Sequence, residues 1–132
     1  MFACPMSPLF RKSEKKVAEE AAAQVEIKRL KALSAEDLAM LVLPGLGPNG
    51  VKPGSSVRVQ LLCNDLLRGF PGAGNQQAMQ LFGCVTKALE SLERADLVSS
   101  ISYSRLPVWR ITHLGEAALA DGTIDQHLRK AG

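Results

Sequence analysis

The stretch Val85–Leu119, VTKALESLERADLVSSISYSRLPVWRITHLGEAAL, decides the fold. It begins with the 3.6-residue apolar spacing of an amphipathic helix, which stops at residues 95–96. Two short runs that favour strands follow at 99–103 and 108–112, with the turn-like SRLP between them. The chain then enters another helix after Thr112. The sequence therefore predicts a helix, a β-hairpin and a second helix in that order.

Two parts of this stretch carry a family resemblance. VTKALESLERADLV resembles the end of a recognition helix, and WRITHLGEAAL resembles the last wing strand and its exit. In their order and spacing, these parts resemble the winged helix-turn-helix DNA-binding domains of prokaryotic transcriptional regulators, over about half to two-thirds of the chain. The resemblance implies an α+β fold, mostly helical, with an added N-terminal helix. It also implies double-stranded DNA as partner, with helix 76–94 in the major groove and the hairpin 99–112 as wing.

Length and composition restrict the remaining classes of protein. With 132 residues, 46% of them hydrophobic, the chain has room for one domain and one appended helix. No apolar run approaches the roughly 18 residues of a membrane span, and the N-terminus lacks the apolar core of a secretory signal, so we expect a cytoplasmic protein. Three cysteines without metal-ligand spacing predict neither a disulfide framework nor a zinc site. No catalytic constellation is evident, so we expect no enzyme, no metal and no cofactor.

The net charge of +3 is unevenly distributed. Residues 1–34 carry seven Lys and Arg against four Glu, whereas the rest of the chain is balanced. The basic excess therefore lies in the N-terminal segment and supports nucleic-acid binding by the C-terminal half only weakly.

The N-terminal part divides into a flexible segment, 1–12, and a helix, 13–33, which precedes a winged-helix domain at 34–132. The helix is rich in Ala, Glu and Lys, and its apolar stripe is thin. Two interpretations stay open: a solvated helix that packs one edge on the domain, or a dimerisation helix. Because a two-fold operator requires a two-fold protein, we expect a homodimer. The residues expected to form it are Val17, Ile27 and Leu30.

Local signals place the remaining elements. Ser34 is a candidate N-cap for a helix at 35–43, and the Gly/Pro-rich segment 44–56 predicts a loop without regular structure. The apolar spacing that follows predicts a helix at 56–68, although Val57 and Val59 also fit a short strand. A longer helix is predicted at 76–95. Asp96 stands where many members of the family have a left-handed Gly, a conformation that Asp tolerates better than most residues.

The polar face of helix 76–95 is the candidate reading surface. Gln offers a donor and an acceptor that match adenine, Lys reaches guanine or phosphate, and Gly83 lets the helix backbone approach DNA closely. Glu90 and Glu93 oppose such binding. The candidate DNA-binding residues are Gln76, Gln77, Gln80, Gly83, Thr86, Lys87, Arg105 and Arg110.

Other interpretations remain beside the DNA-binding one. A Gln/Lys face is also typical of the solvated side of an amphipathic helix. The main alternative function is a winged-helix module that binds another protein and not DNA. A third is a regulator that senses a ligand or a thiol.

Overall fold

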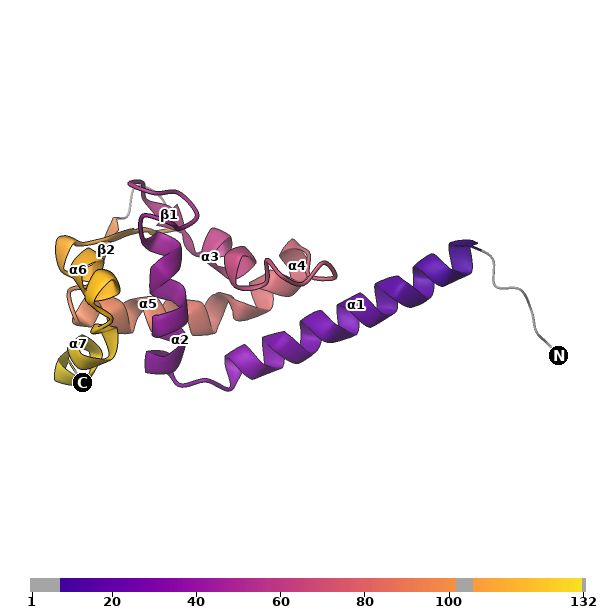
Figure 1. Ribbon diagram of the computed structural model, residues 1–132, viewed down its shortest axis with the longest axis horizontal. Coiled ribbons are helices and arrows are strands. Elements are labelled where there is room, and N and C mark those ends of the chain that lie inside the picture. The colour runs from indigo at the N-terminus through magenta and orange to yellow at the C-terminus, as the bar shows by residue number, and fades with distance from the viewer. Residues whose placement is uncertain (1–7, 102–105, 132) are drawn as a thin grey trace.

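The computed structural model describes residues 8–101 and 106–131. They form a mostly helical α+β fold with a small antiparallel sheet, which confirms the expected class (Figure 1). The elements are α1 (Pro8–Lys31), α2 (Ala35–Val42), η1 (Leu43–Leu46), β1 (Val57–Arg58), α3 (Val59–Leu66), α4 (Asn75–Ala78), η2 (Met79–Leu81), α5 (Phe82–Arg94), β2 (Val98–Ile101), β3 (Val108–Ile111), α6 (His113–Asp121) and α7 (Ile124–Ala131).

The sheet has three strands in the order β1-β3-β2, and both pairs are antiparallel. The predicted hairpin is confirmed at β2 and β3, while its tip, residues 102–105, lies outside the described residues. Of the two interpretations of residues 56–68, the short strand is present at Val57–Arg58 and the helix starts only at Val59. The segment 56–68, whose apolar spacing fits either a helix or a strand, therefore contains a short strand followed by a helix.

Cap chemistry explains several boundaries. The Ser34 hydroxyl accepts a hydrogen bond from the Asp37 amide at 3.1 Å, which confirms the N-cap of α2. Asp96 adopts φ 62°, the left-handed conformation expected for it after α5. Gly122, at φ 67°, ends α6 in the same conformation and separates it from α7.

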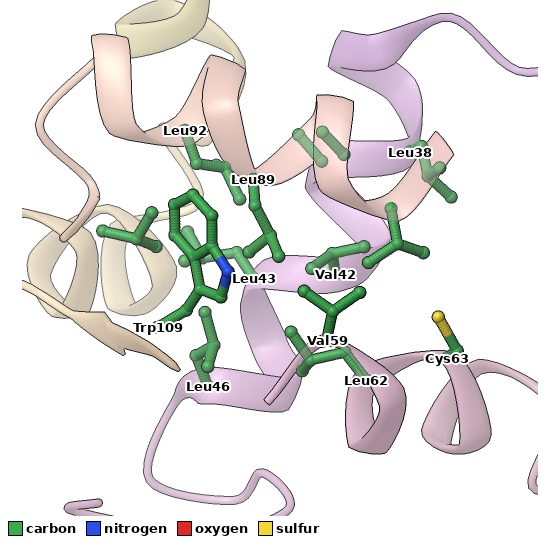
Figure 2. Packing of buried hydrophobic residues seen from close by; sticks show 14 of the residues in the cluster. Leu38, Val42, Leu43, Leu46, Val59, Leu62, Cys63, Leu89, Leu92 and Trp109 are labelled. Atoms are coloured by element: carbon green, nitrogen blue, oxygen red, sulfur yellow. The ribbon is translucent and has the colours of Figure 1, made fainter. Parts of the chain in front are cut away.

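The core lies where α2 crosses α5 beside the inner face of the sheet. Leu43, Leu89 and Leu92 surround the Trp109 indole, which is 4% exposed (Figure 2). The indole Nε1 is buried and has no hydrogen-bond partner among the described residues. The expectation that segment 44–56 lacks regular structure is wrong at its start. There η1 continues directly from α2 and buries Leu46, because an apolar residue within the Gly/Pro run is drawn into the core.

The N-terminal helix α1 extends away from the body of the molecule (Figure 1). It begins at Pro8, earlier than residue 13, because proline is tolerated in the first turn of a helix. Ile27 and Leu30 are 0% and 1% exposed, so the expectation that they form a dimer interface is wrong: they fill the protein's own core. No helix in the two described ranges is long and apolar enough to cross a membrane.

Candidate nucleic-acid interface

The predicted continuous helix 76–95 is broken into α4, η2 and α5. Each residue of a 3₁₀ helix turns about 20° further than one of an α-helix, so the three residues of η2 rotate α4 by about 60° relative to α5. The face on which one continuous helix would place Gln76, Gly83 and Lys87 is therefore not kept. The break places Leu81 fully inside the core.

Two of the three candidate glutamines have partners inside the protein. The Gln80 and Gln24 side chains exchange hydrogen bonds at 3.0 and 3.4 Å, which link η2 to α1. The Gln77 side-chain oxygen accepts from the Gly74 amide at 3.0 Å and caps α4. Gln76 is exposed. Hence a base could meet Gln80 only if the bonds to Gln24 were exchanged.

Gly83 and Lys87 lie on the solvent-exposed side of α5. Both are exposed, and apart from its chain neighbours and the backbone of its own helix, no atom of the described residues lies within 4 Å of the position that a Cβ of Gly83 would take. Thr86 is half-buried, and its hydroxyl donates to the Phe82 carbonyl at 2.7 Å, so this candidate is satisfied within its own helix.

A groove of about 450 Å³ separates this part of α5 from the end of α1 and the start of α2. Its lining residues are Lys31, Leu33, Ala35, Leu38, Gln80, Gly83, Cys84 and Lys87. Lys31 was not predicted as a site residue. The signal that pointed to it was the basic excess of residues 1–34, whose last lysine is brought to the same groove as Lys87.

The groove that Lys31 and Lys87 line also contains the thiol of Cys84. Burial raises the pKa of Cys84, and this effect outweighs the backbone hydrogen bonds and the charges of Lys31 and Lys87, which lower it. Burial likewise raises the pKa of Cys63 to about 12. Both thiols are therefore protonated at neutral pH, which disfavours the thiolate chemistry of a redox sensor.

The remaining candidates lie elsewhere. Arg110 is exposed on β3, on the face opposite Trp109, and lines a different cavity of about 630 Å³ with Ser99 and His113. This cavity shares no lining residue with the groove that contains Lys87. Arg105 lies outside the described residues.

Of the two opposing carboxylates, Glu93 is turned toward the sheet. It accepts hydrogen bonds from the Ser100 hydroxyl at 2.7 Å and from the Ser100 amide at 3.3 Å. Glu90 is exposed. Ser100 thus holds the Glu93 carboxylate toward the sheet, whereas the Glu90 carboxylate faces solvent.

Within the described residues, no group of three or more His, Cys, Asp or Glu side chains is arranged to hold a metal ion. Comparison of the chain with protein-family models, with curated proteins and with solved structures gives no significant match.

Proposed function

We propose that this protein binds double-stranded DNA as a small transcriptional regulator of the winged helix-turn-helix type. The order of α2, β1, α3, α5, β2 and β3 and the sheet order β1-β3-β2 support this architecture. In the proposal α3 and α5 are the two helices of the helix-turn-helix, and β2 and β3 form the wing.

One observation carries the proposal: the backbone of α5 is open at Gly83, in a groove that also contains Lys31 and Lys87. A phosphate of the DNA backbone would lie between the two ammonium groups and release counterions on binding. The missing side chain at Gly83 would let the backbone of α5 approach the duplex. Gln80, which lines the groove, would then exchange Gln24 for a base edge.

The test measures affinity for random duplex DNA between about 50 and 200 mM salt, by fluorescence anisotropy of labelled DNA. Lys31→Ala and Lys87→Ala should each weaken binding to all sequences and reduce the slope of log K against log salt by about 0.9. Lys130→Ala is the matched control, because Lys130 is an exposed lysine on α7 that does not line the groove. The control should leave the slope unchanged.

A second variant blocks the open backbone without touching charge. Gly83→Leu should fold, since the space in front of Gly83 is empty, and its side chain should lower DNA affinity at every salt concentration. Wild-type affinity in Gly83→Leu and in the Lys31→Ala/Lys87→Ala double variant would contradict the proposal.

The alternative function, a module that binds another protein, is favoured by a specific contact. The Gln24–Gln80 bonds attach α1 to η2, and Leu33 and Leu38 give the adjoining groove an apolar part. In this alternative the apolar part of the groove holds a side chain of the partner protein. If every groove variant bound DNA as tightly as the wild type, this alternative would be favoured.

A further inference from the structure

α1 is apolar on two opposite faces, and the body of the protein covers only one of them. Its inner face buries Ala23, Ile27 and Leu30. At 100° per residue, Val17 and Val25 lie on the other side of the helix, where they are 65% and 68% exposed. Two further exposed residues, Ala18 and Ala21, lie between them on this outer face.

The charges that flank the outer face have opposite signs. Glu14 precedes the apolar residues by about one turn, and Lys28 follows them by about one turn, on the same side of the helix. The arrangement is symmetrical about Ala21: Val17 and Val25 are equally far from it along the chain, and so are Glu14 and Lys28.

We propose that the outer face of α1, residues 14–28, pairs with the same face of a second copy of this chain, antiparallel, with the two-fold axis at Ala21. Residues equally far before and after Ala21 then face one another. Val17 of each copy packs on Val25 of the other, and Glu14 of each copy forms an ion pair with Lys28 of the other. The contact is isologous, as a two-fold dimer requires.

The charges select this orientation and register. In a parallel pair Glu14 would face Glu14 and Lys28 would face Lys28, and both contacts would be repulsive. Moving the axis of the antiparallel pair to residue 23 would set Val17 against Arg29. Alanine at the axis allows the two helices to approach to about 8 Å, the close end of the usual range.

The contacts inside each copy leave room for this pairing. At 100° per residue, Gln24 lies at the edge of the outer face, next to Val17, and its bonds to Gln80 join that edge to the body. The outer face from Val17 to Val25 is itself left uncovered, so a second helix can pack there. Residues 14–28 span about 21 Å of helix, so the interface is smaller than the roughly 1,000 Å² of a stable complex, and the dimer is weak and reversible.

Sedimentation equilibrium of the full chain from about 10 μM to 1 mM tests the pairing in solution. Wild type should move from monomer toward dimer over this range. Glu14→Lys or Lys28→Glu alone should weaken the dimer about tenfold, because each turns two attractive contacts into repulsive ones. The Glu14→Lys/Lys28→Glu double variant restores both pairs and should return to wild-type affinity. Val25→Glu should remain monomeric, with helical content unchanged by circular dichroism.

Disulfide trapping tests the register independently. Ala21→Cys should cross-link with itself under mild oxidation, because the residue on the axis meets its own copy. Val17→Cys is the matched control and should not exceed the wild-type background from Cys4, Cys63 and Cys84. A mixture of Val17→Cys and Val25→Cys should cross-link. A wild-type protein that stays monomeric at 1 mM, a double variant as weak as the singles, or self-cross-linking of Val17→Cys as efficient as that of Ala21→Cys would each overturn the proposal.

Discussion

α1 and the segment from α4 to α5 both contradict the expectation that a well-packed helix is continuous and an exposed one is broken. α1 is a helix of 24 residues without a break, although most of its described side chains are exposed. The segment from Asn75 to Arg94 buries far more apolar surface, yet it breaks at η2. Strong packing and a continuous helix are therefore separate properties.

The difference has a physical cause. In α1 the Ala, Glu and Lys side chains favour a helix, and little packing competes with that preference. Residues 75–94 must instead satisfy several neighbours, because α4 and η2 contact α1 while α5 packs on α2 and α3. A uniform helical period cannot direct side chains to all of them, and the tighter turn at η2 reorients Leu81. Propensity sets the continuity of a lightly packed helix, and tertiary packing sets the shape of a heavily packed one.

The largest expected effect compares two apolar residues, one from each region. Leu89→Ala in α5 removes a side chain that is 0% exposed and should lower the free energy of unfolding by about 2–5 kcal/mol. Val17→Ala in α1 removes one that is 65% exposed and should change it by less than about 0.5 kcal/mol. Urea denaturation followed by circular dichroism, at a concentration where the chain is monomeric, measures both. Equal losses would show that the outer face of α1 is packed as tightly as the buried face of α5.

An intermediate effect is expected where the two regions touch. A Cβ at Gly72 would overlap the backbone of Glu19, so Gly72→Ala should push α1 off the body and cost about 1–3 kcal/mol. Hydrogen exchange of the α1 amides should rise more than that of α5. Gly69→Ala is the control, because nothing lies within 4 Å of a Cβ there. Unchanged exchange in Gly72→Ala would mean that the contact with Glu19 does not hold α1 in place.

The smallest expected effect concerns helix propensity within α5. Gly83→Ala adds a methyl group to open space and should raise the free energy of unfolding by up to about 1 kcal/mol. Gly122→Ala, at φ 67°, should instead lower it by about 1 kcal/mol, because alanine is strained in the left-handed conformation. Thermal unfolding compares the two substitutions, which differ only in backbone geometry. A stabilising Gly122→Ala would refute this account of the cap between α6 and α7.

What the sequence predicted correctly rests on local chemistry. The Ser34 cap and the left-handed Asp96 depend on residues within a few positions of one another, and the hairpin strands pair residues at most 13 positions apart. The end of α5 and the start of α2 could therefore be located without any knowledge of packing.

What the sequence missed rests on contacts between distant residues. Gln24 and Gln80 are 56 positions apart, and no periodicity indicates that they pair. The same holds for Lys31, which shares a groove with Lys87 because the end of α1 and the start of α2 lie beside α5. The break at η2 also results from contacts between distant residues. Its residues, Met79–Leu81, include neither proline nor glycine, so the sequence does not indicate a break there.

The surroundings of Trp109 give the protein a built-in optical probe. It is the only tryptophan of the chain, and its indole lies among leucines with Nε1 unpartnered within the described residues. An indole shielded from water in this way should fluoresce at short wavelength, and its emission should shift to the red when the junction of the sheet, α2 and α5 opens to solvent. α1 contains no tryptophan, so its unfolding changes the far-ultraviolet ellipticity but not the tryptophan emission. A difference between the midpoints of the ellipticity and fluorescence transitions would therefore measure how independently the projecting helix unfolds.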